Sequence, residues 1–157
     1  GGAPVAVKAL EKRKMQELKV PWSLIESEVS IMRECNNQGW FVQLVDFIDT
    51  SHTYFIILEY CDGGNLEEAA GKCEGNLGEG KVALMMWQML QAVVFLHSRS
   101  ICHRDIKPQN ALVAGSVHGE DVRVKLCDFG IAARLRPGQL LQDKVGTPAF
   151  MAPEMHL

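Results

Sequence analysis

The first part of the chain alternates apolar and polar positions in a pattern typical of strands around one helix. Residues 4–8 alternate as a short strand, which we expect to be buried and to end at the basic Lys8. After Pro21, apolar side chains recur at helical spacing. Residues 42–50 and 53–60 are β-branched and aromatic and flank a polar pair, which is the pattern of an antiparallel hairpin. This part therefore predicts the order β-α-β-β.

The second part begins with an Asp-Gly-Gly break at 62–64 and is mainly helical. Residues 79–98 carry apolar side chains at three- and four-residue steps, which predicts a long, mostly buried helix. The apolar positions of this helix are Val82, Met86, Met89, Leu90, Val93 and Leu96. Two short strands at 111–114 and 122–127, joined by a polar turn, are expected to follow. A strand-rich part followed by a helical part indicates two lobes.

Length and composition are those of a single globular domain. The 157 residues are 47% hydrophobic and 22% charged, which excludes a disordered tail and a collagen-like chain. The net charge of −3 gives no electrostatic reason to expect nucleic acid or an anionic membrane as a partner. No apolar run reaches the ~18 residues that a membrane span needs. We therefore expect a soluble protein.

The cysteines argue for a reducing compartment. There are five of them, an odd number, and none is spaced as a CxxC pair. This pattern disfavours both a disulfide framework and a structural zinc site. We therefore expect an intracellular, cytoplasmic location.

Four short strings that carry chemical groups follow one another in a fixed order. They are VAVK at 5–8, HRDIKPQN at 103–110, DFG at 128–130 and APE at 152–154. Each is weak evidence alone, but their order and spacing resemble the eukaryotic protein kinase family of the serine/threonine type. The resemblance covers the whole length of the chain.

The resemblance implies an α+β, protein kinase-like fold with two lobes. Residues 1–60 correspond to small-lobe structure, 61–64 to the hinge and 65–157 to large-lobe structure. The GxGxxG loop of the family does not occur in this sequence, and the later helices would follow Leu157. We therefore expect a partial kinase domain, in which the small lobe lacks its first strands and the large lobe its later helices. Such a piece should be marginally stable, because apolar faces of the sheet and the long helix lack partners.

Phosphoryl transfer needs a cation on the phosphates, and the resemblance implies that Lys8 supplies it. Glu28 lies twenty residues later on the apolar face of the first helix, where it can pair with Lys8 and orient it. Glu26 is the nearest alternative but lies two positions off that face. The alternative for both groups is a solvated surface role, which the apolar flanking positions disfavour.

The HRDIKPQN and DFG strings imply the catalytic centre. Asp105 is the expected acceptor of the substrate hydroxyl proton, and Asn110 and Asp128 are the expected oxygen ligands of Mg²⁺. Lys107 resembles the lysine that serine/threonine kinases place near the transferred phosphate. Thr147 resembles the threonine that hydrogen-bonds toward the catalytic Asp and Lys in that class, the alternative being an ordinary turn threonine.

ATP needs an apolar slot with backbone donors and acceptors, which the family builds at the segment joining the lobes. The residues expected around the adenine are Ala6 as roof, Leu58 as gatekeeper, Glu59 and Cys61 in the connecting segment, Leu112 as floor and Cys127 at the back. Four further residues, whose role is packing, are expected to stack through the core: Met32, Leu44, His103 and Phe129.

A glycine-rich string at 75–82 resembles a phosphate-binding loop only superficially. Residues 75–82 nearly fit the phosphate-binding GxxxxGK[ST] loop, but Val82 replaces the Mg²⁺-binding hydroxyl and no strand precedes the string. We interpret it as a turn before the long helix.

Regulation by a fixed charge is a further hypothesis. Arg104 resembles the arginine that such kinases pair with a phosphate, yet no Ser, Thr or Tyr occurs between Gly130 and Thr147. Asp143 occupies the position where the phosphate would be, and we expect it to supply a permanent, weaker negative charge to Arg104. The alternative is a solvated loop aspartate.

Substrate preference and partners are less defined. The string at 143–147 and the long turn after Leu112 resemble the calmodulin-dependent and calcium-dependent kinase group, which implies a calcium sensor or regulatory segment outside this chain as a partner. Asn65 and Gln109 stand where basophilic members carry acidic residues, so a strong preference for substrate arginine is not expected.

Three functions were weighed. The first is a protein kinase that uses ATP and Mg²⁺ to phosphorylate Ser or Thr of a protein substrate. The second is a pseudokinase scaffold that binds partners without transferring phosphate, which the presence of all the expected catalytic residues disfavours. The third is a small-molecule kinase of the same fold. The Gly-Thr-Pro string at 146–148 and the APE string at 152–154 disfavour it, because they resemble a platform for a protein substrate.

Overall fold

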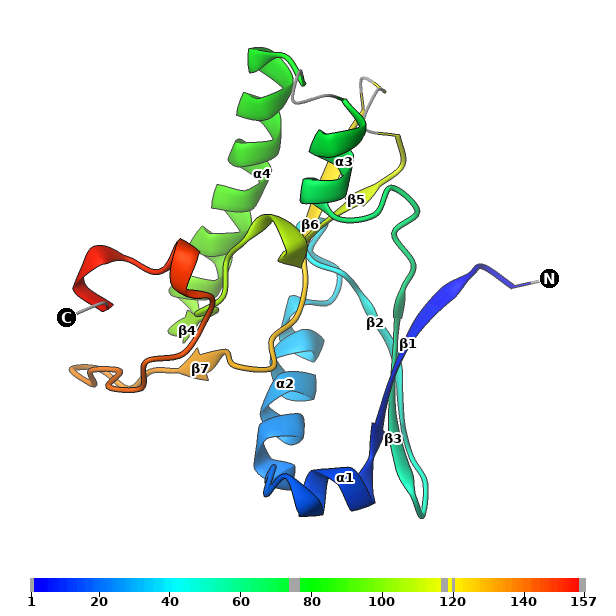
Figure 1. Ribbon diagram of the computed structural model, residues 1–157, viewed down its shortest axis with the longest axis vertical. Coiled ribbons are helices and arrows are strands. Elements are labelled where there is room, and N and C mark those ends of the chain that lie inside the picture. Colours follow the sequence, from blue (N-terminus) through cyan, green and yellow to red (C-terminus); the bar gives the residue numbers. More distant parts are fainter. Residues whose placement is uncertain (1, 74–76, 117–118, 120, 156–157) are drawn as a thin grey trace.

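The computed structural model describes residues 2–73, 77–116, 119 and 121–155. A small three-stranded sheet with one long helix forms one part, and two helices with two short pairs of strands form the other (Figure 1). This is the mixed α+β, partial kinase-like arrangement that the sequence predicts.

The three-stranded sheet has the order β1-β3-β2 and is antiparallel throughout. Its strands are β1 (Val5–Glu11), β2 (Leu44–Asp49) and β3 (Thr53–Glu59). The hairpin β2–β3 is the predicted one. Helix α2 (Trp22–Cys35) lies beside this sheet in Figure 1 and turns its buried residues toward the core. The short helix α1 (Lys12–Glu17), which connects β1 to α2, was not predicted.

Strand β1 corrects the expectation of a buried strand ending at Lys8. The strand continues to Glu11, and its residues alternate between exposed and half-buried. The reason is its position at the edge of the sheet, where β3 is its only neighbour among the described strands. Lys8 therefore lies in mid-strand, paired in register with Ile56.

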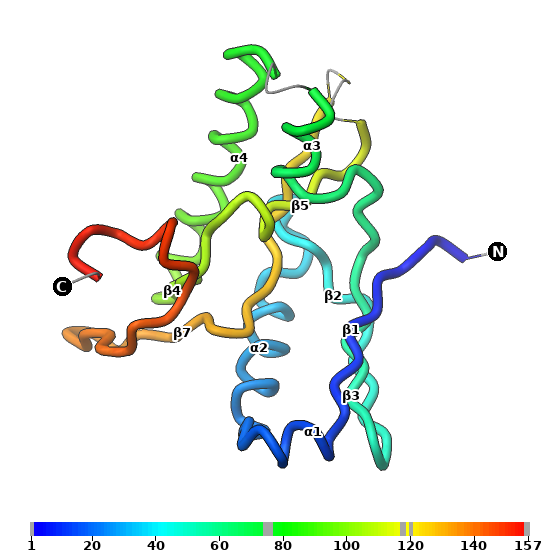
Figure 2. Tube along the Cα trace, viewed as in Figure 1, coloured from blue at the N-terminus to red at the C-terminus, as the bar shows by residue number. Residues whose placement is uncertain are grey.

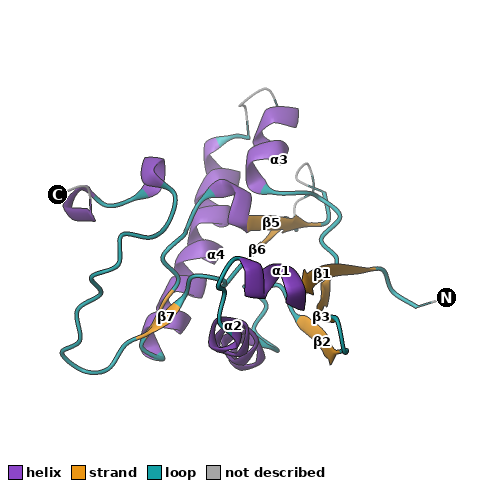
Figure 3. Ribbon diagram, turned by 60° about the horizontal axis from the view of Figure 1, so that its bottom comes forward, coloured by secondary structure: helices purple, strands orange, loops and turns teal. Residues whose placement is uncertain are grey.

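The second part contains α3 (Leu66–Lys72), α4 (Glu79–Ser98), and the hairpin of β5 (Ala111–Ala114) and β6 (Arg123–Leu126). Strands β4 (Ile101–Cys102) and β7 (Ala133–Arg134) form a second short pair. The 3-10 turns Pro108–Asn110, Pro148–Phe150 and Pro153–Met155 complete the described elements. In Figure 3 the segment after β7 loops away from the rest of the molecule before it returns to the C-terminal turns.

Helix α4 has the predicted bounds but is not mostly buried. Met85, Met89, Ala92 and Leu96 are its buried residues. Val82, Met86 and Leu90 remain 43%, 50% and 56% exposed. The apolar side chains of α4 point to most sides of the helix. The described chain packs against only one of these sides, chiefly through β6 (Figure 2). The spacing therefore identified the helix but not its unpartnered side.

Backbone hydrogen bonds join the two parts at the segment after β3. Gly63 N donates to Val113 O at 3.0 Å, and Val113 N donates to Gly64 O at 2.8 Å. A Cβ on Gly63 would lie 2.7 Å from carbonyl oxygens of Val113 and Gly115, so this close approach requires glycine. One hydrophobic core runs through both parts, with Phe41 and Phe129 among its fully buried members.

One sequence interpretation concerns a segment that the structure describes only in part. The glycine-rich string at 75–82 lies partly outside the described residues, and its described end forms the start of α4 at Glu79. In the described part of the chain, no helix combines the length and apolarity needed to cross a membrane.

Candidate functional site

A cavity of about 180 Å³ lies between the sheet, α2 and the β5–β6 hairpin. Eight of the nine residues expected around the nucleotide line it: Ala6, Lys8, Glu28, Leu58, Glu59, Leu112, Cys127 and Asp128. The ninth, Cys61, is buried in the connecting segment but does not line the cavity. Met32 and Val42 complete the wall, and Val42 was not anticipated.

An ion pair between the half-exposed Lys8 and the buried Glu28 lies in the wall of this cavity. Lys8 Nζ lies 2.6 Å from Glu28 Oε1, and Glu28 is only 2% exposed. Glu26 is exposed, as its position off the apolar face predicts. Lys8 Nζ also lies 3.8 Å from Asp128 Oδ1. Because a buried carboxylate is costly without a cation, this pairing holds the lysine at the cavity wall.

Asp128 projects into the open side of the site. It follows Cys127 at the end of β6 and has a φ of +62°, in the left-handed region that non-glycine residues seldom adopt. Its side chain is 53% exposed, and the only described hydrogen bond to Oδ1 comes from Gly130 N at 3.3 Å. Burial raises the pKa of the neighbouring Cys127 thiol to about 12, which keeps that side chain neutral.

Asp105 is the centre of a second cluster, in which three side chains hold its carboxylate. Thr147 donates to Oδ1 through both its hydroxyl (2.6 Å) and its backbone N–H (3.0 Å). Lys107 Nζ lies 2.7 Å from Oδ2, and Asn110 Nδ2 donates to Oδ2 at 2.9 Å. Lys107 also donates to the Thr147 hydroxyl at 2.7 Å, so the cluster is cross-linked.

The electrostatics of this cluster keep Asp105 ionised. Desolvation is the largest single influence and raises the pKa of Asp105, but the hydrogen bonds from Lys107, Thr147 and Asn110 together outweigh it. The net pKa of the carboxyl group is lowered from its ordinary value. The cluster therefore presents an oriented anion beside a cation.

His103 connects the two aspartate sites. Its Nε2 lies 3.0 Å from Cys127 O, and Asp105 N donates to Nδ1 at 3.3 Å. The ring meets Phe129 edge-on, with 5.2 Å between centroids. Burial lowers the pKa of this histidine. Met32, Leu44, His103 and Phe129, the four residues expected to stack, are all buried.

Arg104 and Asp143 approach each other as the fixed-charge hypothesis requires. The Arg104 Nη1 atom lies 3.5 Å from Asp143 Oδ2, and Arg104 Nε donates to Ile131 O at 2.5 Å. Nη1 is buried and makes no hydrogen bond to a described residue. Asp143 is therefore the only described carboxylate that offers this buried cation a counter-charge.

Two polar contacts near the site were not anticipated. Lys125 Nζ lies 2.5 Å from Glu59 Oε1, linking β6 to the end of β3. The position of Lys125 inside an apolar strand indicates that its charge needs a partner, because lysine is seldom buried unpaired. Gln109 Nε2 donates to Glu67 Oε2 at 2.7 Å, which brings a carboxylate of α3 to the turn Pro108–Asn110. Neither partner could be identified from spacing, because both contacts cross long stretches of chain.

Oxygen donors suited to Mg²⁺ are present between the two clusters. Asn110 uses its Nδ2 for Asp105, which leaves its amide oxygen available, and Asp128 offers an exposed carboxylate. Amide and carboxylate oxygens are the hard donors that Mg²⁺ prefers. These residues fit the ion.

Comparison with known proteins gives consistent matches. The family model described as the protein kinase domain matches residues 1–156. Human serine/threonine-protein kinase ULK1 is 32% identical over 155 residues, a match that covers 96% of this chain and 14% of that protein. CDPK-related kinase 3 of Arabidopsis thaliana is 32% identical over 152 residues, covering 97% and 25%. A probable myosin light chain kinase of Dictyostelium discoideum is 30% identical over 154 residues, covering 98% and 38%. The chain thus spans between 14% and 38% of the length of these relatives.

Proposed function

The chain belongs to the protein kinase family, and from that premise we propose that it carries the phosphoryl-transfer site of an ATP-dependent serine/threonine protein kinase. The cross-linked cluster around Asp105 is the observation that carries the proposal. A carboxylate that is ionised, oriented and adjacent to a cation is what a hydroxyl nucleophile needs beside a phosphate.

Asp105 orients the substrate hydroxyl and accepts its proton. The donors Thr147 and Asn110 hold the carboxylate in one fixed orientation for the substrate hydroxyl. Lys107 bridges Asp105 and Thr147 and places a positive charge where negative charge develops on the transferred phosphoryl group.

Lys8 binds the phosphates of the nucleotide, and Glu28 holds it in place. Ala6, Leu58 and Leu112 supply the apolar walls for the adenine, and Glu59 lines the same cavity. Backbone groups of Glu59 and of Cys61, which lies just outside the cavity lining, supply the hydrogen bonds to the adenine. Asn110 and Asp128 would hold Mg²⁺, which neutralises phosphate charge when it is bound.

The partners proposed here follow the family. A protein that bears Ser or Thr is the substrate, and a calcium sensor or regulatory segment outside this chain is the proposed regulator. The similarity to a CDPK-related kinase supports this choice of regulator. The cytoplasmic location and the division at the 61–64 hinge stay predictions from the sequence.

The assay that tests the proposal measures transfer from Mg-ATP to Ser, Thr and Tyr peptide libraries by the full-length protein. We expect transfer to Ser and Thr that disappears in Asp105→Asn. Nucleotide binding by a cooperatively folded protein without transfer to any library would instead support the pseudokinase scaffold. Transfer to a small molecule alone would support the third function.

A further inference from the structure

The last turn of α2 carries an acidic residue that the proposed function does not use. Glu34 is half-buried, and each of its two carboxylate oxygens faces an arginine. Oε1 accepts a hydrogen bond from Arg134 Nη2 in β7, and Oε2 lies 3.9 Å from Nη1 of Arg99, the residue that follows α4. The helix dipole opposes a negative charge in the last turn, so the two cations offset a cost that Glu34 would otherwise impose on α2. We call these three residues the Glu34 bridge.

The loop after α2 gives the helix one attachment to the second part of the molecule. Val42 N donates to Leu126 O at 3.1 Å, and Leu126 N donates to Trp40 O at 2.8 Å, so this loop is fixed to β6. A single attachment of this kind does not fix the orientation of a helix. Among the described side chains of α2, only Glu34 has a hydrogen bond or ion pair to the second part. The Glu34 bridge therefore supplies a second polar attachment.

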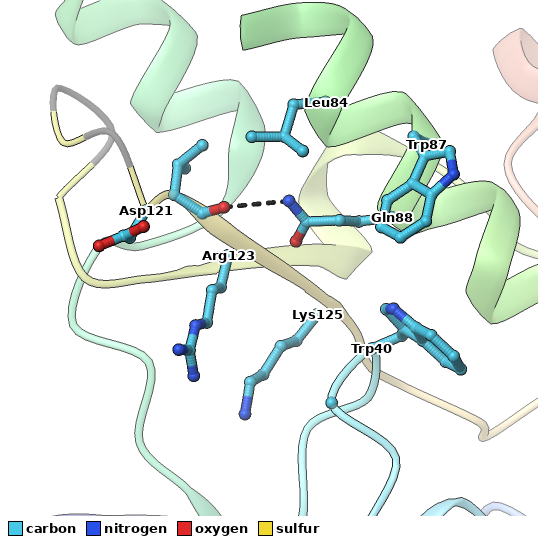
Figure 4. A pocket seen from close by; sticks show the side chains of 9 residues that line it. Trp40, Leu84, Trp87, Gln88, Asp121, Arg123 and Lys125 are labelled. Carbon is cyan, nitrogen blue, oxygen red and sulfur yellow. Dashed lines mark hydrogen bonds between the residues drawn. The ribbon is translucent and has the colours of Figure 1, made fainter.

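Both arginines of the bridge belong to the body that carries Asp128. Strand β7 pairs with β4, which directly follows α4. Helix α4 is fixed to β6, because Gln88 donates to Val122 O at 3.0 Å, as Figure 4 shows, and accepts from Val124 N at 2.8 Å. Strand β6 ends two residues before Asp128. An attachment of α2 to these arginines is thus an attachment to the element that places Asp128.

The segment after Asp128 passes α2 at two heights. A Cβ on Gly130 would lie 3.9 Å from Glu28 Oε2 and 4.0 Å from Lys8 Nζ, so this segment first runs beside the ion pair of the cavity. It then reaches Arg134, which pairs with Glu34 in the last turn of the same helix. Six residues of helix separate the two glutamates, a rise of ~9 Å. Strand β7 accordingly runs beside α2 in Figure 1.

We propose that Glu34 is a positioning residue for phosphoryl transfer, a role that rests on the proposed kinase function. The charge of Glu34 holds α2 against β7 and the end of α4. It thereby keeps Glu28, and through it Lys8, at a fixed distance from Asp128. Lys8 and Asp128 then bind one nucleotide together, with no further movement of α2. A small displacement is costly at such a site, because both groups must act on the same phosphates at once.

The test measures kcat and the KM values for Mg-ATP and for a Ser/Thr peptide with the full-length protein. Glu34→Gln keeps the size of the side chain and removes its charge. We expect the KM for Mg-ATP to rise about fivefold, the upper range for a half-exposed ion pair, and the KM for the peptide to stay unchanged. Arg134→Met removes the partner and should have the same effect. Glu26→Gln is the matched control, because it makes the same change at an exposed residue of the same helix.

A charge reversal and a double variant separate positioning from a general loss of stability. Glu34→Arg/Arg134→Glu restores an oppositely charged pair and should bind Mg-ATP more tightly than either of its single variants. Asp128→Asn removes the group toward which α2 is positioned, so adding Glu34→Gln to it should weaken Mg-nucleotide binding by less than about twofold further. Circular dichroism confirms that each variant is folded.

Three results would overturn the inference: an unchanged KM for Mg-ATP in both single variants, an equal rise in Glu26→Gln, or fully additive losses in the double variant. Absence of Mg-nucleotide binding by the unsubstituted protein would instead overturn the proposed function, and this inference with it.

Discussion

The two aspartates of the site, Asp105 and Asp128, are held in opposite ways. The carboxylate of Asp105 receives hydrogen bonds on both oxygens from Thr147, Lys107 and Asn110. Asp128 is half exposed and has a single long hydrogen bond from Gly130. The described chain thus supplies both oxygens of one carboxylate with hydrogen-bond donors and leaves the other carboxylate half exposed. Under the proposed function, Asp105 is the group that the fold positions, whereas Asp128 would gain its strongest interaction from a bound cation.

The largest effect is expected from a change of Asp105, the aspartate whose carboxylate is hydrogen-bonded on both oxygens. Asp105→Asn keeps the shape but removes the proton acceptor, so we expect kcat to fall by ~10²–10⁴-fold. The affinity for nucleotide should be nearly unchanged, because the proposed phosphate site is at Lys8 rather than at Asp105. Steady-state kinetics with a Ser/Thr peptide and a fluorescent nucleotide titration measure the two quantities. A variant with full kcat would remove Asp105 from the chemistry.

The second effect tests the ligand-dependent aspartate. Asp128→Asn should weaken Mg²⁺-dependent nucleotide binding by at least the ~10–100-fold that loss of an outer-shell partner costs a metal site. Binding measured without Mg²⁺ should change less, because the only cationic group near Asp128 among the described residues is then Lys8, whose Nζ lies 3.8 Å away. Nucleotide titrations over a series of Mg²⁺ concentrations give both values. If the variant bound equally well at every Mg²⁺ concentration, the contrast between the two aspartates would fail.

The third effect concerns how strictly Asp105 is positioned. Thr147→Val removes one donor to Oδ1 while keeping the side-chain volume, and we expect kcat to fall roughly tenfold, the lower end of the cost of a hydrogen bond to a charged group. Thr147→Ser retains the hydroxyl and should restore most of the rate. Peptide phosphorylation assays compare the three proteins. Equal rates for the Val and Ser variants would assign Thr147 an ordinary turn role.

The fourth effect uses pH to test the connection between the aspartates. The pKa of His103 lies below its ordinary value of 6.5 because the ring is buried. The unfolded chain therefore binds the proton more tightly than the folded chain, so the free energy of unfolding is greatest above pH 6.5 and declines as pH falls through the folded pKa. Protonation also removes the acceptor for Asp105 N.

Urea unfolding at a series of pH values between about 5 and 8 measures this dependence. In His103→Phe, overall stability should be lower, but the His103 contribution to the decline below pH 6.5 should be absent. An identical pH dependence in both proteins would show that other groups cause it.

How far the sequence predicts this molecule depends on the range of each interaction. The bounds of α4 and the buried face on which Glu28 lies follow from apolar periodicity, which is local. The pairing of Lys8 with Glu28 was expected from the family resemblance, because the two residues lie on different elements. The exposed side of α4 could not be predicted, because spacing shows which residues are apolar but not whether a partner covers them. The same limit applies to Lys125 and Glu59, which meet only when β6 packs against the end of β3.

Backbone conformation at the site is a second feature that the sequence does not predict. Arg104 and Asp128 both adopt positive φ, at +68° and +62°, although neither is glycine or asparagine. Local propensity disfavours this conformation, and the packing around His103 and Phe129 imposes it. Such positions are common at functional sites, where tertiary contacts overrule local preference.

The smallest expected effect concerns Asp143, the most exposed acidic group linked to the site. Its side chain is 77% exposed and lies 3.5 Å from Arg104, so the pair is screened by water and salt. Surface pairs contribute ~0–1 kcal/mol, which limits the loss of activity in Asp143→Ala to about fivefold. The loss should shrink as ionic strength rises, and Asp143→Glu should retain most of the rate. Full activity of Asp143→Ala at low salt would show that Arg104 needs no fixed counter-charge and that its hydrogen bond to Ile131 O suffices to hold the guanidinium.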